Sequence, residues 1–426
     1  MVGLTLLIAL IVLLILNVPV GIALGVSSMF ALVVGDTLSL TSIPQALITS
    51  CDSFPILAIP LFILAGDLMG AGGVSRRILD VCNVFFGRIT GGLAIVTVLV
   101  CMFFAAVSGS GPATVAAVGT MVIPTMLKLG YDRSFVLALV ATAGSIGVII
   151  PPSIPMVIFG VSTGTSVTSL FMGGFFPGFL IGFSLIAYCY WFAKKHGYTG
   201  SKEPFDGKKA WAATWEAKWA LINPVIILGG IYTGLFTPTE AAAVAAIYAY
   251  ICGAFIYREL PPKKLIKAIS TSCSTTATTM VILGCATAFT KIITIEQIPT
   301  MVTQMMMTVS DSPIVILLLI NLILLIVGCF MDTTPAILVL APILLPVATS
   351  IGLDPIHFGL IMVTNLAIGF ITPPLGINLF VASRISDSSM EVILKGIVPF
   401  ILIMLIDLML ITFIPDIVMF LPDLMK

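Results

Sequence analysis

Two short segments 222 residues apart place a glycine four residues before a pair of adjacent prolines. Residues 147–152 read Gly-Val-Ile-Ile-Pro-Pro, and residues 369–374 read Gly-Phe-Ile-Thr-Pro-Pro. A proline inside a helix removes one N–H donor and clashes with the carbonyl four residues back. Pro151 and Pro373 should therefore free the carbonyls of Gly147 and Gly369. Clustered oxygens are the ligands that hard cations prefer, and Na⁺ is a similarly hard cation.

Each break has neighbours that can complete a cation site. A residue that precedes proline is pushed away from the helical region, so the carbonyls of Ile150 and Thr372 also turn out of the helix. A helix-breaking tip precedes each break and is expected to face it. We predict two related Na⁺ sites. The first comprises Ala106, Gly147, Ile150 and Ser153, and the second comprises Gly328, Gly369, Thr372 and Leu375.

The two tips also carry groups that suit an anion. Residues 108–112 read Ser-Gly-Ser-Gly-Pro, and residues 328–335 read Gly-Cys-Phe-Met-Asp-Thr-Thr-Pro. The helices that start there present free N–H groups to an anion. A substrate site is therefore predicted between the cation sites, with candidates Ser108, Ser110, Asp332, Thr333, Thr334, Asn378 and Arg384. Asp332 is equally interpretable as a helix cap, and Arg384 as an ordinary basic residue at a membrane edge.

The breaks belong to a longer internal repeat. At the 222-residue offset, positions 124–177 and 346–399 share 12 identities in 54 positions without a gap. Matching interruptions in two apolar halves indicate the binding site of a secondary transporter. The alternative is that the prolines are structural kinks without a ligand.

The composition indicates that this chain lies in a membrane. Of 426 residues, 59% are hydrophobic and 9% are charged, and the mean hydropathy is +1.21. A soluble domain carries about 25% charged residues. We therefore predict an all-α polytopic membrane protein. The net charge of zero gives no support for nucleic-acid binding, and the eight cysteines form no C-x-x-C pair, so we expect them to be unpaired.

Lys and Arg mark cytoplasmic loops and predict the topology. Residues 194–218 hold six Lys, residues 36–53 hold no basic residue, and their repeat counterpart 258–267 holds four. This reversal predicts two inverted repeats, each with five spans and one re-entrant hairpin. Both termini are then periplasmic, and 17 of the 19 basic residues lie inside. The alternative for each hairpin is two ordinary spans.

The predicted boundaries follow from this topology. The first repeat covers 1–195, with a hairpin at 91–128 and a broken span at 133–165. A cytoplasmic linker covers 196–218. The second repeat covers 219–426, with a hairpin at 312–351 and a broken span at 355–384. Semi-polar segments at 42–55, 73–90, 260–275 and 295–310 are predicted to be interfacial amphipathic helices.

The motifs resemble one family along the whole chain. They include residues 52–62 (Asp-Ser-Phe-Pro-Ile-Leu-Ala-Ile-Pro-Leu-Phe), 149–154 (Ile-Ile-Pro-Pro-Ser-Ile), 234–240 (Gly-Leu-Phe-Thr-Pro-Thr-Glu) and 371–374 (Ile-Thr-Pro-Pro). This pattern resembles the large membrane subunit of TRAP (tripartite ATP-independent periplasmic) transporters, the DctM-like family.

The resemblance implies a Na⁺-driven importer of an acidic organic solute, such as sialic acid or a C4-dicarboxylate, in the bacterial inner membrane. It implies an elevator mechanism, a small four-helix membrane subunit and a periplasmic substrate-binding protein. Some relatives carry the small subunit fused at the N-terminus. Since this sequence starts at the large subunit, the small one is expected to be a separate polypeptide.

Other function classes find less support. The sequence has no H-E-x-x-H and no G-x-x-x-x-G-K-[ST] motif, and its only histidines are His196 and His357. Neither a metallohydrolase nor an ATPase is therefore expected. The alternative that stays open is a self-sufficient Na⁺/carboxylate transporter of similar architecture.

Overall fold

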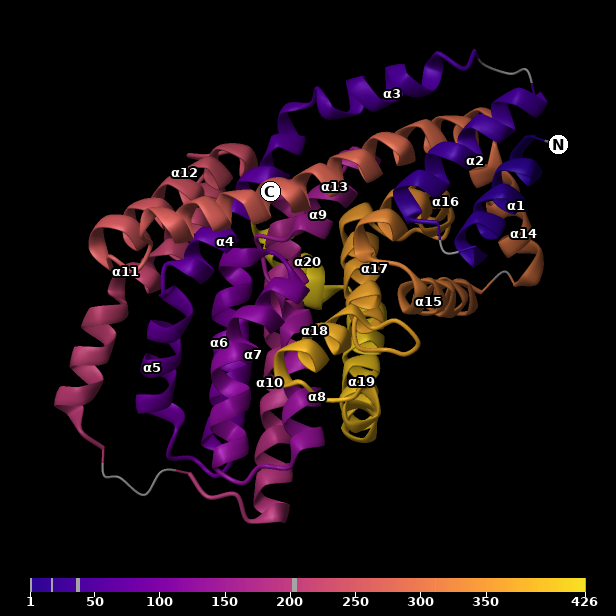
Figure 1. Ribbon diagram of the computed structural model, residues 1–426. Coiled ribbons are helices and arrows are strands. Elements are labelled where there is room, and N and C mark those ends of the chain that lie inside the picture. Colours follow the sequence, from indigo (N-terminus) through magenta and orange to yellow (C-terminus); the bar gives the residue numbers. More distant parts are fainter. Residues whose placement is uncertain (1, 17, 36–38, 201–204, 311, 426) are drawn as a thin grey trace.

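The computed structural model describes residues 2–16, 18–35, 39–200, 205–310 and 312–425. Throughout this part of the chain the only regular structure is helical (Figure 1). Seven of its helices are long and apolar enough to cross a membrane. The predicted class, an all-α polytopic membrane protein, is confirmed.

The described residues of the first half form ten α-helices. They are α1 (Val2–Ile15), α2 (Val20–Gly35), α3 (Ser42–Cys51), α4 (Ala58–Ala71), α5 (Val74–Phe86), α6 (Gly92–Ser108), α7 (Gly111–Lys128), α8 (Arg133–Ser145), α9 (Ile154–Thr163) and α10 (Val167–His196). The part of the second half that the structure describes also forms ten. They are α11 (Gly207–Tyr232), α12 (Pro238–Ile251), α13 (Pro262–Ile295), α14 (Ile298–Val309), α15 (Pro313–Phe330), α16 (Thr333–Ser350), α17 (Pro355–Gly369), α18 (Ile377–Ser386), α19 (Met390–Phe413) and α20 (Asp416–Leu424).

The 222-residue repeat extends to the bounds of the helices that follow the tips. Helices α7 and α16 both begin immediately after a tip and both run for 18 residues. Each hairpin therefore consists of two helices joined by a two-residue turn, at Gly109-Ser110 and at Met331-Asp332. The opposite orientation of the halves in a membrane, and the re-entrant path of each hairpin, stay predictions.

The two halves differ where one contains a proline and the other does not. In the first half, α3 and α4 are separated by a 3₁₀ turn at Phe54–Leu57 that contains Pro55. The equivalent position in the second half is Ala277. There α13 is one continuous helix of 34 residues, and it runs along the top of Figure 1 beside α3. The prediction of a separate interfacial helix at 260–275 is therefore wrong.

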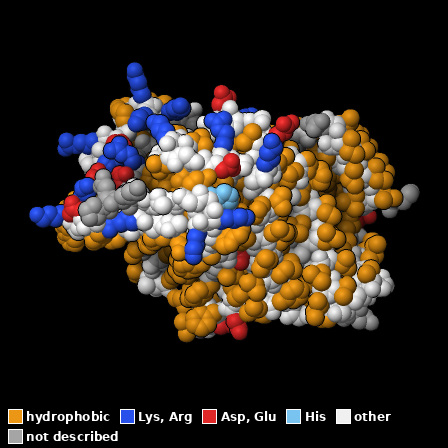
Figure 2. All heavy atoms as spheres, turned by 90° about the horizontal axis from the view of Figure 1, so that it is seen from below, with side chains coloured by type: hydrophobic (Ala, Val, Ile, Leu, Met, Phe, Trp, Pro, Cys, Tyr) orange, Lys and Arg blue, Asp and Glu red, His pale blue; other side chains and the backbone are white. Residues whose placement is uncertain are grey.

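Much of the predicted linker at 196–218 is helical. Helix α10 ends at His196, and α11 already begins at Gly207. The Asp206 carboxylate caps α11 by accepting from the backbone N–H of Lys208 at 2.9 Å. Residues 207–218, assigned to the linker from their polarity, are therefore helical. Residues 201–204 of that linker lie outside the described residues. In Figure 2, Lys and Arg side chains gather on one part of the face seen from below, beside a broad hydrophobic area.

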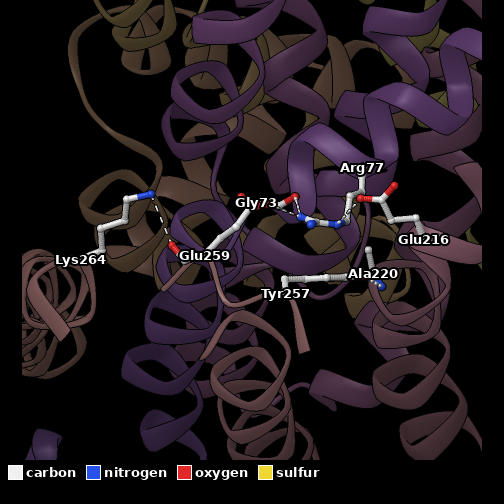
Figure 3. Close-up of polar contacts among 7 residues, drawn as sticks. All are labelled: Gly73, Arg77, Glu216, Ala220, Tyr257, Glu259 and Lys264. Atoms are coloured by element: carbon white, nitrogen blue, oxygen red, sulfur yellow. Dashed lines mark hydrogen bonds and ion pairs between the residues drawn. The ribbon is translucent and has the colours of Figure 1, made fainter. Parts of the chain in front are cut away.

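One arginine ties three framing elements together (Figure 3). On α5, Arg77 Nη1 lies 2.8 Å from Glu259 Oε1 and donates to the Gly73 carbonyl at 3.0 Å. Its Nε lies 3.4 Å from Glu216 Oε1 on α11. Its guanidinium group stacks 3.8 Å from the centroid of the Tyr257 ring. Helices α5 and α11 and the α12–α13 connection are thus fixed to one side chain.

Tyr257 extends this cluster, because its hydroxyl accepts the backbone N–H of Ala220 at 3.0 Å. Burial raises the pKa of Tyr257 to about 12. The phenol therefore stays neutral at physiological pH, and the cluster should not titrate through this residue.

The Arg77 cluster predicts a stability effect. Replacing Arg77 with Lys keeps the charge but loses the planar fork that contacts Glu259 while stacking on Tyr257. We expect Arg77→Lys to reduce the free energy of unfolding by about 1–2 kcal/mol, measured by thermal denaturation in detergent. Arg76→Lys is the control, and equal unfolding temperatures for the two variants would contradict the clamp.

The inverted topology predicts opposite accessibility for matched loops. Ser39 and Lys264 are both exposed, and their loops differ in charge. In a Cys-less background, an impermeant thiol reagent added from the periplasmic side should label Ser39→Cys and leave Lys264→Cys unlabelled. Equal labelling from one side would refute inversion.

Candidate functional site

The first break lies between α8 and α9. Helix α8 tightens into a 3₁₀ turn at Ile146–Val148, and the chain then leaves the helix at the two prolines. Ser153 caps α9 by accepting from the N–H of Met156 at 3.4 Å. The same hydroxyl donates to the Val148 carbonyl at 2.6 Å. Ser153, a predicted Na⁺ ligand, is fully buried. Through these two hydrogen bonds its hydroxyl bridges the two sides of the break.

The first hairpin tip packs directly on this break. The N–H of Ile154 donates to the Gly109 carbonyl at 3.3 Å. Gly147 lies so close to the tip that a Cβ on it would stand 2.7 Å from the Ser110 carbonyl oxygen. Ser108 Oγ lies 3.0 Å from Thr114 Oγ1. The tip therefore adds carbonyl and hydroxyl oxygens to the break, and only glycine at position 147 allows this approach.

The second break repeats the arrangement with other side chains. Helix α17 ends at Gly369, whose carbonyl accepts the N–H of Thr372 at 3.2 Å. The prediction that Pro373 leaves this carbonyl free is therefore wrong, because a tighter turn replaces the lost helical bond. A Cβ on Gly369 would collide with the Gly328 backbone. The N–H of Leu375 donates to the Cys329 carbonyl at 3.3 Å. The second tip and the second break thus form one cluster of close backbone groups, as expected from the sequence.

Asp332 occupies the cap position of α16. Its Oδ1 accepts from the N–H of Thr333 at 2.7 Å, and Thr333 Oγ1 lies 3.3 Å away. The interpretation of Asp332 as a helix cap is therefore correct. Its side chain is also exposed to a cavity, so capping does not use up its hydrogen-bonding capacity.

Both tips open onto the same cavity of about 370 Å³. Ser108, Gly109 and Ser110 line one side, and Asp332, Thr333 and Thr334 line another. The remaining polar wall comes from Asp67 on α4 and from three threonines of α13, Thr271, Thr275 and Thr279. Among the described residues that line the cavity there is no Lys, Arg or His. The cavity is thus built from hydroxyls, carboxylates, backbone and apolar groups.

Sequence reasoning missed the wall formed by α4 and α13. Asp67 accepts a hydrogen bond from Ser272 Oγ at 2.6 Å, which joins the two helices beside the cavity. The signal was present, since Thr271, Thr275 and Thr279 recur every four residues and therefore share one helix face. The sequence alone does not show that this face lines the cavity, because that depends on how the second half packs against the first.

A second cavity of about 380 Å³ adjoins the first. The two share Gly66, Asp67, Ala113 and Ala116, and the second continues to Ser75, Arg76 and Thr120. Small side chains of α7 thus face α4 along a route from the tips toward Arg76. That Arg76 lies on the cytoplasmic side follows from the charge rule and stays a prediction.

Two predicted substrate residues lie away from the cavity lining. Asn378 is fully buried and donates to the Ala141 carbonyl at 3.0 Å and to Ser145 Oγ at 3.1 Å. Arg384 is exposed in the last turn of α18. Contact of either side chain with a substrate stays a prediction.

The amino-acid sequence matches one family of known proteins over most of its length. The family profile described as the DctM component of tripartite ATP-independent periplasmic transporters matches residues 7–417. The large permease protein DctM of a C4-dicarboxylate TRAP transporter from Vibrio cholerae is 41% identical over 433 residues, covering 96% of this chain and 95% of that protein.

A longer relative shows higher identity. The isethionate TRAP transporter permease protein DctMQ from Oleidesulfovibrio alaskensis is 49% identical over 407 residues, which cover 96% of this chain. The chain spans only 64% of that relative's length. Among solved structures, the YdaH transporter from Alcanivorax borkumensis aligns with a TM-score of 0.60 over 88% of each chain, at 16% identity. That likeness supports the fold alone.

The close backbone contacts predict the effect of a single methyl group. Gly147→Ala and Gly369→Ala should push the tips away from the breaks and weaken Na⁺ binding at least tenfold. At a fixed Na⁺ concentration above the dissociation constant, this loss removes about 1.4 kcal/mol of Na⁺-dependent stabilisation. The measurement is the rise in unfolding temperature when Na⁺ replaces choline. Gly229→Ala is the control, because no atom lies within 4 Å of its added Cβ. An unchanged Na⁺ response in both test variants would exclude these sites.

Proposed function

The chain belongs to the DctM family of TRAP transporters, and we propose that it is the substrate-translocating permease subunit of a Na⁺-coupled importer for a small organic anion. The observation that carries this proposal is the convergence of both hairpin tips on one cavity. Each tip also packs on its own proline break. Cation and substrate sites would therefore share structural elements, as coupled transport requires.

Na⁺ is the proposed coupling ion because of the oxygens at the breaks. Pro151 and Pro373 cannot donate to the carbonyls four residues before them. Oxygen-rich clusters of backbone suit a hard cation of low charge. Na⁺ at both breaks would also supply positive charge close to a cavity that has no basic side chain in its described lining.

The proposed anion would lie between the tips. Helices α7 and α16 start there, and their first N–H groups have no partner within the helix. The hydroxyls of Ser108, Ser110 and Thr334 add donors. The relatives named for isethionate and for C4-dicarboxylate both act on small organic anions. We propose a substrate from this class, with a hydroxyl or other donor group that reaches Asp332.

Release is proposed along the adjoining cavity toward Arg76. We propose an elevator movement in which the hairpins and broken spans travel together against the wall formed by α4 and α13. The facing surface of α7 carries Ala113, Ala116 and Ala117, and such small side chains obstruct sliding less than large ones do.

The family name and the name DctMQ of one relative support two proposed partners. These are a small membrane subunit and a periplasmic binding protein, acting with this chain in the bacterial inner membrane. The test is uptake of the anion into proteoliposomes that contain both membrane subunits under an inward Na⁺ gradient. Uptake should need both Na⁺ and the binding protein. Equal uptake without the binding protein would favour a self-sufficient transporter.

Asp332 can be dissected by two substitutions. Asparagine is as good a helix cap as aspartate, so Asp332→Asn keeps the cap and removes the charge, whereas Asp332→Ala removes both. If the carboxylate accepts an ionic hydrogen bond worth about 1.5–3 kcal/mol, both variants should lose at least tenfold in uptake while still inserting. Uptake by Asp332→Asn within a factor of two of the parent would show that Asp332 acts only as a cap.

A further inference from the structure

We infer that Asn378 joins the two breaks into one unit, so that Na⁺ occupancy at one proposed site changes Na⁺ affinity at the other. The inference rests on the proposed function and assigns a positioning role to a residue that lies outside the cavity lining. Three sets of contacts support it. The first and third link an element of one half to an element of the other, and the second ties Asn378 to the second break.

The first set is made by the side chain of Asn378. It lies in the first turn of α18, just after the second break. Its amide nitrogen donates to the Ala141 carbonyl at 3.0 Å and to Ser145 Oγ at 3.1 Å. Both acceptors belong to α8, and Ser145 stands two residues before Gly147. Asn378 and Ser145 are both fully buried, so water does not compete for these bonds.

The second set is made by the backbone of the same residue. The N–H of Asn378 donates to the Phe370 carbonyl at 3.1 Å. Phe370 directly follows Gly369, the central residue of the second predicted cation site. One residue therefore holds the backbone of the second break through its N–H and the helix entering the first break through its amide.

The third set places the start of α7 between the breaks. A Cβ on Gly111 would lie 3.0 Å from the Phe370 ring and 3.4 Å from Asn378 Oδ1. The preceding residue, Ser110, presents its carbonyl to Gly147 on the other side. Movement of either break would therefore displace the first tip or be resisted by it.

The repeat does not account for this contact. The position equivalent to Asn378 in the first half is Met156, whose side chain cannot donate a hydrogen bond. The link is therefore asymmetric and is not a by-product of duplication. A buried amide that lost its partners would be left unsatisfied, which is unfavourable, so the two breaks are held in one relative arrangement. Two sites held in this way are coupled if Na⁺ binding at either one favours that arrangement.

The decisive experiment measures Na⁺ cooperativity in the complete transporter. In the parent, the Hill coefficient for Na⁺ should approach about 2 for two coupled sites. Asn378→Asp keeps the size but cannot donate to Ala141, and Asn378→Ala removes the link entirely. Both should lower the Hill coefficient to about 1, and Ser145→Ala should lower it less, because the bond to Ala141 remains.

Asn365 provides a matched control. It is a fully buried asparagine on α17, and its amide donates to Asn321 Oδ1 at 2.8 Å within the second half. Asn365→Ala should destabilise the protein while leaving the Hill coefficient unchanged. A thermal unfolding curve for each variant separates stability from cooperativity.

The outcomes separate failure of the proposed function from failure of the coupling role of Asn378. Parent uptake that is independent of Na⁺ would overturn the proposed function itself. Na⁺-dependent parent uptake with an unchanged Hill coefficient in folded Asn378→Asp and Asn378→Ala would overturn the coupling role alone. An equal drop in Asn365→Ala would show that the effect reflects general destabilisation, and it too would overturn the role of Asn378.

Discussion

A backbone carbonyl without a partner is costly inside a membrane, and the arrangement of this protein follows from that cost. In hydrocarbon each unsatisfied backbone group costs several kcal/mol, so irregular backbone is tolerated only where protein or a wet cavity surrounds it. Each proline pair removes the N–H that would otherwise pair with such a carbonyl, and at the second break the N–H of Thr372 takes its place by donating to the Gly369 carbonyl at 3.2 Å. The hairpin tips approach these breaks, and glycines at 147 and 369 permit contact between backbone and backbone.

The two halves satisfy this constraint with different side chains. In the first, the Ser153 hydroxyl bridges its break by donating to the Val148 carbonyl, whereas the equivalent position in the second half is Leu375. At the tips, Ser110 of the first half corresponds to Asp332 of the second. The shared backbone pattern suits two similar cation sites. The unlike side chains give the cavity a hydroxyl at the first tip and a carboxylate at the second. An asymmetric solute can be oriented by such a cavity.

Local rules explain which features were predictable. The breaks, the tips and the capping role of Asp332 follow from proline, glycine and short polar side chains, whose effects extend over only a few residues. The continuity of α13 was missed because polarity was read as a boundary although no proline interrupts Pro262–Ile295. The direction of Asn378 and the cavity face of Thr275 depend on how one half packs on the other. No pattern within either half determines that packing.

We propose that the two breaks bind Na⁺ in concert with an anion in the shared cavity. This can be measured by equilibrium binding of ²²Na⁺ to the purified complex of both membrane subunits. About two Na⁺ should bind per permease chain, and they should bind more tightly when the transported anion is present. Binding of no Na⁺, or Na⁺ affinity that is the same with and without the anion, would contradict it.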